Sequence, residues 1–328
     1  MSDQRRTLAE TWAARELGWS DWQSEAISSD ASFRRYFRLS HDGQTRVVMD
    51  APPEREPVDT FVDIAQRLKP LVHVPDIMAA DVAQGLVLLE DLGSTPYHHR
   101  LNSQNADALF SDALAALLAL QTSAPIDGLP GYDAALLMRE LALFPDWFLA
   151  RHWQVEPTEA ELDDWDMLCA LLIRWALDQP QVFCHRDFMP RNLMVSEPNP
   201  GVIDFQDAVI GPISYDPVCL FRDAFLSWPT ARVDSWLEGY RQTARQAGLP
   251  ITDSDRLWQR QCDFMGVHRH LKVLGIFARI AYRDAKPAYL DDAPRFFDYL
   301  SVAIARNPEL GLLEELLGHW RARARLPG

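Results

Sequence analysis

The residues of this chain best suited to chemistry lie in the segment HRDFMPRN, residues 185–192, and at Asp204, twelve residues after Asn192. Two short apolar runs flank a stretch rich in turn formers, residues 196–201, and this pattern predicts a tight β-hairpin. In an antiparallel hairpin the start of the first strand lies beside the end of the second. We therefore expect Asn192 and Asp204 to meet at the open end, with Asp187 on the loop leading in.

This residue set suits phosphoryl transfer. Carboxylate and amide oxygens are ligands for a hard cation such as Mg²⁺, and a further carboxylate can act as a general base. Taken singly, a His-x-Asp sequence or an Asp after an apolar strand is more commonly a turn cap. Their combination in this order, with a hairpin between them, favours the catalytic interpretation.

The elements around the hairpin predict two parts. An amphipathic helix opens the chain, and the following segments alternate like strands around an Asp42-Gly43 turn. From about residue 104 the pattern is helical almost throughout, apart from the segment 182–205. The expected strands are 33–39, 46–49, 73–83 and 85–89, and the expected helices include 57–71, 106–121 and 161–177.

Composition limits the possible classes of protein. The chain has 328 residues, 48% of them hydrophobic, which is enough for a sizeable core or two lobes. Its net charge of −15 argues against nucleic-acid binding. The four cysteines have no Cys-x-x-Cys spacing, which argues against a zinc site or a disulfide framework. The N-terminal segment lacks the apolar core expected of a signal peptide, and no apolar run reaches about 20 residues. We expect a cytoplasmic monomer without membrane contact.

The order of these segments resembles the aminoglycoside phosphotransferase and choline kinase branch of the protein-kinase-like enzymes, over about residues 25–300. The resemblance implies an α+β, bilobal fold. Residues 1–91 would form a small antiparallel β N-lobe with one helix. Residues 92–328 would form a larger, mainly helical C-lobe that holds the catalytic loop, the metal loop and the acceptor pocket.

The resemblance also implies roles for individual residues. Asp187 would be the general base, and Asn192 and Asp204 would hold Mg²⁺ against the phosphates of ATP. Backbone groups near Glu90 and Leu92 would bind the adenine edge, although a strand ending in an acidic turn is the simpler interpretation of that segment alone.

Ser28, Ser29 and Ser32 occupy the place of a phosphate-covering loop in this family. The segment has no glycine, but small side chains allow close backbone approach and serine hydroxyls can donate to phosphate. An ordinary turn between strands is the alternative.

One feature departs from the kinase pattern. The third strand normally carries a lysine that binds the α- and β-phosphates, whereas here Met49 stands near that position. None of the three lysines of the chain lies on an expected N-lobe strand. Either an arginine substitutes, with Arg35 or Arg46 as candidates, or the enzyme relies on the metal and the backbone to bind the phosphates. The missing lysine also allows a pseudokinase that binds nucleotide without turnover.

Several neighbours of the catalytic residues have more than one interpretation. Arg191 could neutralise charge on the transferred phosphoryl group or simply pair with an acidic side chain. His185 and Arg186 are expected to brace the catalytic loop. By the same resemblance, Asp216 would tie the following helix to this loop, which is a structural role.

The charge of the C-terminal segment bears on the acceptor. Residues 241–328 carry 14 basic and 10 acidic side chains, which is unlike a site for polycationic aminoglycosides. The segment RHLKVLG contributes Arg269, His270 and Lys272, which would suit a neutral or anionic acceptor if they face the pocket and say nothing if they face solvent.

Together with residues 28–38 and 48–54, the segment RHLKVLG resembles bacterial cell-wall amino-sugar kinases. These enzymes phosphorylate the anomeric hydroxyl of N-acetylmuramate and N-acetylglucosamine in peptidoglycan recycling. The resemblance thus implies a small-molecule sugar as the partner. An antibiotic kinase of the same fold and a non-catalytic nucleotide-binding protein remain the alternatives.

Overall fold

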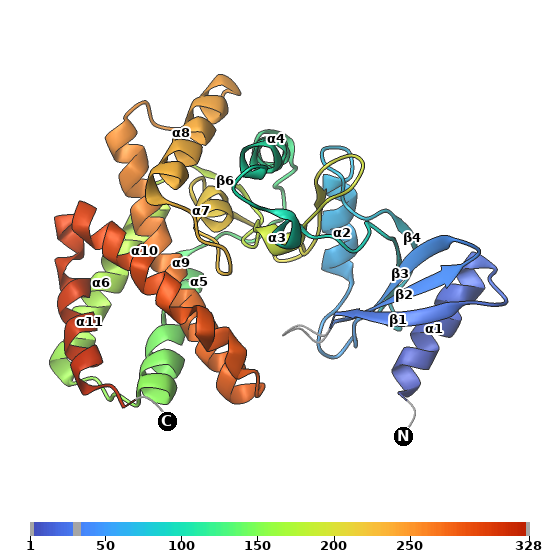
Figure 1. Ribbon diagram of the computed structural model, residues 1–328, viewed down its shortest axis with the longest axis horizontal. Coiled ribbons are helices and arrows are strands. Elements are labelled where there is room, and N and C mark those ends of the chain that lie inside the picture. Colours follow the sequence, from blue (N-terminus) through green and yellow to red (C-terminus); the bar gives the residue numbers. More distant parts are fainter. Residues whose placement is uncertain (1–2, 29–33, 326–328) are drawn as a thin grey trace. The chain divides into compact units, whose positions relative to one another are not determined.

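A computed structural model describes residues 3–28 and 34–325 (Figure 1). The chain divides into two compact units. The first comprises residues 1–125 and 190–207, and the second comprises residues 126–189 and 208–328. The hairpin segment thus belongs with the N-terminal unit, and the boundary at residue 91 that we expected between functional lobes stays a prediction.

The first unit is built on an antiparallel sheet of order β1-β2-β3-β5-β4. This is the α+β arrangement that we expected, with an additional edge strand, β1, that was not among the expected strands. Helices α1, α2, α3 and α4 and the hairpin β7–β8 complete the unit. The bounds are α1 Gln4–Leu17, β1 Gln23–Ser28, β2 Arg35–His41, β3 Gln44–Asp50, α2 Asp59–Leu68, β4 Ile77–Asp81, β5 Leu86–Glu90, α3 Tyr97–Arg100, α4 Ala106–Ser123, the 3₁₀ turn η2 Pro190–Asn192, β7 Leu193–Met194 and β8 Gly201–Val202.

The alternation of buried side chains along β2 shows which face of the sheet each one occupies. Phe37 and Leu39 are buried in one cluster with Trp12 and Ala13 of α1, because alternate side chains of a strand point to the same face. Tyr36 is next to Phe37 along the strand and therefore points to the other face. It lies opposite Met49 of β3 in the register. The sheet thus has one face covered by α1 (Figure 1) and one that carries Tyr36 and Met49.

The second unit is mainly helical around the long helix α9. Gly275 of α9 allows a close approach to the π-helix η1, since a Cβ there would lie 2.3 Å from the carbonyl carbon of Leu143. Strand β6 precedes the catalytic segment and β9 follows it, and these two short strands pair with each other. The bounds are α5 Ala134–Leu141, η1 Phe144–Trp153, α6 Glu159–Leu177, β6 Gln181–Cys184, β9 Val209–Pro212, α7 Tyr215–Phe221, α8 Thr230–Gln246, α9 Asp255–Arg283, η3 Pro287–Asp292, α10 Ala293–Arg306, η4 Pro308–Leu310 and α11 Gly311–Arg323.

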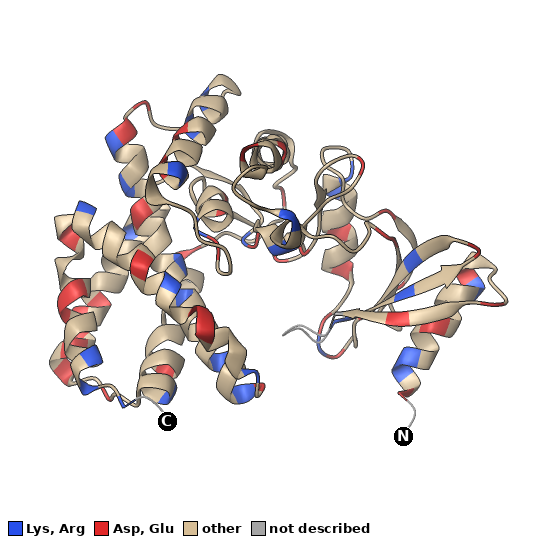
Figure 2. Cartoon of the chain, in the orientation of Figure 1, with Lys and Arg blue, Asp and Glu red and all other residues tan. Residues whose placement is uncertain are grey.

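The basic excess of the C-terminal helices does not form a surface of one sign. Figure 2 shows acidic and basic residues interspersed on α10 and α11. Several of the arginines are paired, such as Arg306 with Asp234 and Arg323 with Glu161. Within the described parts of the chain, no helix is both long and apolar enough to cross a membrane.

Candidate active site

The hairpin predicted from the sequence is present and brings Asn192 and Asp204 together. Leu193 pairs with Val202 and Met194 with Gly201 in antiparallel register. At the open end the amide of Ile203 donates to the carbonyl oxygen of Asn192 at 3.0 Å. The Asn192 side-chain amide lies 3.3 Å from a carboxylate oxygen of Asp204. Asp204 has a positive φ of 64°, which turns the chain sharply after β8.

Neighbouring side chains hold Asp204 in place while its carboxylate stays exposed. Gln206 donates to its second oxygen at 2.9 Å. The next residue, Phe205, is fully buried and contacts the ring of Phe61 in α2 at a centroid distance of 5.0 Å. An exposed carboxylate on a buried anchor is well suited to bind an ion.

The donor set of this turn fits Mg²⁺ bound together with a nucleotide. The described residues contain no cluster of three or more His, Cys, Asp or Glu that could hold a metal alone. Mg²⁺ in nucleotide sites usually takes one or two carboxylates and completes its shell with phosphates and water. Asp204 and the amide oxygen of Asn192 match that pattern.

In the second unit, Asp187 lies on a loop braced by Asp216 of α7. The Asp216 carboxylate accepts hydrogen bonds from the backbone amides of His185 at 2.7 Å and of Arg186 at 3.0 Å. The amide of Asp187 in turn donates to the His185 ring at 3.3 Å. These contacts confirm the structural role predicted for Asp216 and the bracing role predicted for His185. Asp187 itself remains partly exposed.

A buried charge network lies behind this loop. Arg186 pairs with Glu140 at 2.5 Å, and Lys272 pairs with the same carboxylate oxygen at 2.9 Å. Burial opposes ionisation of Glu140, but Lys272, His268 and Arg186 outweigh it and lower its pKa to about 2. The network therefore holds a permanent negative charge between two cations. It also fixes Lys272, which donates to the Tyr215 hydroxyl at 3.0 Å.

The three candidate acceptor residues on α9 differ in their surroundings. All three are buried, so α9 has no solvent-facing basic stripe in this region. Lys272 belongs to the Glu140 network, and His270 stacks on Tyr299 at a centroid distance of 4.9 Å. Arg269 donates to the carbonyl oxygen of Arg222 at 3.2 Å and forms no ion pair with a carboxylate among the described residues.

Asp223 is a candidate that the sequence analysis missed. One of its oxygens accepts from the amides of Phe225 and Leu226, both at 2.8 Å. The other oxygen is buried without a hydrogen-bond partner in the described part of the chain. The charges of Asp187, Asp223 and Arg269 all act on the pKa of the Cys219 thiol, and both carboxylates also act on the pKa of Arg269, so they lie near its guanidinium. The only available signal was an Arg222-Asp223 pair within an otherwise apolar run.

Asp91, which lies between the two candidates Glu90 and Leu92, ties the expected adenine-binding segment to the sheet. Arg38 binds both carboxylate oxygens of Asp91, at 2.6 and 3.0 Å, and the Gly93 carbonyl oxygen at 3.0 Å. The amide of Glu90 is already used, since it donates to the Asp76 carbonyl oxygen at 2.9 Å. The structure gives the Leu92 amide no partner among the described residues, and its side chain is buried.

The expected phosphate loop lies mostly outside the described residues. Ser29 and Ser32 are not described, and Ser28 is the last residue of β1. Arg191 lies in the short 3₁₀ turn η2 and is partly exposed.

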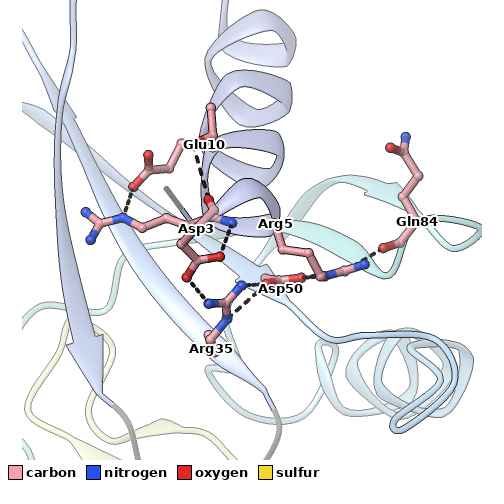
Figure 3. A network of polar contacts seen from close by, with 8 residues as sticks. Asp3, Arg5, Glu10, Arg35, Asp50 and Gln84 are labelled. Atoms are coloured by element: carbon pink, nitrogen blue, oxygen red, sulfur yellow. Dashed lines mark hydrogen bonds and ion pairs between the residues drawn. The ribbon is translucent and has the colours of Figure 1, made fainter. Parts of the chain in front are cut away.

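Arg35 is occupied elsewhere. Its guanidinium binds Asp3 and the buried Asp50, and Arg5 binds Asp50 as well, in the network of Figure 3. Arg46 donates to the carbonyl oxygen of Thr45 and contacts the sulfur of Met78.

Comparisons with known proteins show the family of this chain. Residues 24–258 match the model of the phosphotransferase enzyme family. The chain belongs to this family. An N-acetylmuramate/N-acetylglucosamine kinase from Pseudomonas aeruginosa is 56% identical over 88% of this chain and 86% of that protein. One from Neisseria meningitidis serogroup B is 40% identical over 96% of this chain and 97% of that protein.

Solved structures of other kinases and phosphotransferases share the fold. A choline kinase from Streptococcus pneumoniae superposes with a TM-score of 0.61 at 14% identity, covering 92% of this chain and all of that chain. An ADP-bound aminoglycoside phosphotransferase gives 0.58 at 16% identity, covering 90% of this chain and 98% of that chain. These matches confirm the α+β kinase-like fold expected from the sequence.

Proposed function

We propose that this phosphotransferase is an ATP- and Mg²⁺-dependent kinase for N-acetylmuramate and N-acetylglucosamine that acts on the anomeric hydroxyl in peptidoglycan recycling. The observation that carries the proposal is the identity of 56 and 53% to the N-acetylmuramate/N-acetylglucosamine kinases of Pseudomonas aeruginosa and Pseudomonas putida, over 88 and 92% of this chain. The paired Asn192 and Asp204, and the braced Asp187 loop, supply the chemistry that this reaction needs.

In this proposal Asp187 is the general base. It accepts the proton of the anomeric hydroxyl as the sugar oxygen bonds to the γ-phosphorus of ATP and the bond to the ADP oxygen breaks. Bracing by Asp216 and His185 keeps the carboxylate in place, so little reorganisation is needed during the reaction.

Asn192 and Asp204 hold Mg²⁺, which neutralises charge on the nucleotide phosphates when bound. The backbone of the segment at Glu90 and Leu92 binds the adenine, with the Leu92 amide as the donor. Ser28, Ser29 and Ser32 cover the phosphates, and Arg191 stabilises charge on the transferred group.

On the acceptor side, Arg269 is the strongest of the three candidates on α9. Lys272 and His270 are engaged in the Glu140 network and in aromatic stacking, respectively. Arg269 lacks a carboxylate partner in the described residues and lies near Asp187 and Asp223. We assign Arg269 to an oxygen of the sugar, such as the lactyl carboxylate of N-acetylmuramate, and Asp223 to a sugar hydroxyl.

The acceptor assay tests this function directly. The purified protein is incubated with ATP, Mg²⁺ and, in parallel, N-acetylmuramate, N-acetylglucosamine or kanamycin, and ADP release is followed. We expect turnover with both amino sugars, together with loss of their reducing ends, because the phosphate would occupy the anomeric position. Turnover with kanamycin alone would identify an antibiotic kinase instead. Nucleotide binding without transfer to any acceptor would identify a pseudokinase.

A further inference from the structure

The missing strand lysine leaves open which cation meets the nucleotide phosphates. Met49, near the expected lysine position, is fully buried. Arg35 is paired with Asp3 and Asp50, on the same face as Phe37 and α1. The first unit must therefore place a different positive charge near Asp204 if it binds phosphate in the way a kinase does.

Arg34 is such a charge. It directly precedes β2, and its guanidinium Nε lies 2.9 Å from a carboxylate oxygen of Glu56. The side chains of Arg34 and Glu56 are 14 and 19% exposed, so the pair is mostly buried but still accessible. Glu56 precedes α2, the helix whose Phe61 contacts Phe205 beside Asp204.

The hydroxyl of Tyr36 lies near both this ion pair and Asp204. The charges of Asp204, Arg34 and Glu56 all act on the Tyr36 hydroxyl, and burial together with the two carboxylates raises the pKa of this phenol. The three charged groups therefore lie near the same hydroxyl. Tyr36 is also the cross-strand neighbour of Met49, so this is the face on which a strand lysine would lie.

We propose that Arg34, oriented by Glu56, binds the nucleotide phosphates beside Asp204 in place of the strand lysine. This inference rests on the proposed kinase function. A guanidinium can bind two phosphate oxygens at once and stays charged in a mostly buried site, whereas a lysine acts as a point charge. Glu56 is a positioning residue, since it acts through Arg34.

Binding measurements with ADP and adenosine test the assignment in the full-length protein. Arg34→Gln should weaken ADP binding by about 10- to 100-fold, the usual effect of losing a charge-assisted hydrogen bond. Adenosine binding should not change, because adenosine has no phosphate. Arg34→Lys should restore part of the ADP affinity, and Glu56→Gln should reduce it less than Arg34→Gln does.

A matched control and defined contrary outcomes make the test decisive. Arg15→Gln, on the exposed side of α1, removes the same charge from the same unit and should leave ADP binding unchanged. Equal losses of ADP and adenosine affinity, or unchanged ADP affinity in Arg34→Gln with an unchanged melting temperature, would overturn the proposal. So would a selective loss of ADP affinity in Arg46→Gln alone. If the wild type binds ADP but phosphorylates no sugar, the proposed function fails while the assignment of Arg34 is still decided by binding.

Discussion

The side-chain amide of Asn192 lies 3.3 Å from the carboxylate of Asp204, across the open end of a two-residue-per-strand hairpin. This contact orients the Asn192 side chain so that its nitrogen faces Asp204, which leaves the amide oxygen for a cation. It also shows that the hairpin register, and not sequence proximity, creates the proposed metal site.

Asp204→Asn should weaken Mg²⁺-dependent ADP binding by about tenfold or more, because a neutral amide replaces the charged ligand. Titration of Mg²⁺ at fixed ADP measures the loss. Adenosine binding serves as the control and should stay constant. An unaltered Mg²⁺ dependence would rule out the metal role of Asp204.

Asp187→Asn should lower kcat by about 10²- to 10⁴-fold, because the amide cannot accept the proton of the sugar hydroxyl. ADP affinity should be retained, since this residue acts mainly in the transition state. Asp163→Asn, on the exposed face of α6, is the matched control in the same unit and should have wild-type activity. Wild-type kcat in Asp187→Asn would exclude Asp187 as the base.

Asp223→Asn should raise the KM for the sugar with little change in the KM for ATP. The asparagine oxygen can still accept from the amides of Phe225 and Leu226, so the turn is kept. The free acceptor oxygen, however, becomes a donor and is mismatched to a sugar hydroxyl. We expect kcat/KM for the sugar to fall by about 10- to 100-fold.

A panel of monodeoxy sugars extends this measurement to a specific hydroxyl. For one deoxy analogue, the one that lacks the hydroxyl bound by Asp223, kcat/KM of the wild type should be low. The Asp223→Asn substitution should lower kcat/KM for this analogue only a little further. If both KM values rise together, or if only the melting temperature falls, Asp223 has a structural role and not a role in sugar binding.

Glu140→Gln should destabilise the protein by about 3–5 kcal/mol, because Lys272 and Arg186 would lose their shared counter-charge in a buried site. Urea unfolding monitored by circular dichroism measures the change. Asp234→Asn removes a more exposed pair with Arg306 and should cost less than about 1 kcal/mol. Equal effects of the two substitutions would contradict the network.

The same residue predicts a dependence of stability on pH. The pKa of Glu140 is lowered to about 2 from an ordinary value of 4.5. Its stabilising contribution is therefore fully present above about pH 4.5 and is lost as the pH falls toward 2. The stability difference between wild type and Glu140→Gln should shrink over this range. A difference that is constant from pH 7 to pH 3 would contradict the lowered pKa.

The sequence alone was sufficient for the hairpin and for the order of its functional residues. Apolar runs on either side of residues 196–201 determine a local turn, and a local turn needs no distant contact to be recognised. Local patterns indicated a β-rich first part and a helical second part, and the resemblance of their order to a known family implied the kinase-like class. The structural role of Asp216 was anticipated from the resemblance to the kinase family.

Only the tertiary structure decided which charges are available for ligands. Arg34 and Arg35 are adjacent and chemically identical in the sequence, but Arg35 binds Asp3 and Asp50 while Arg34 binds Glu56. Arg269 and Lys272 lie one helical turn apart, yet only Lys272 pairs with Glu140. The physical reason is that the partner of a buried charge comes from a distant segment, and the sequence does not show which segments the fold brings together.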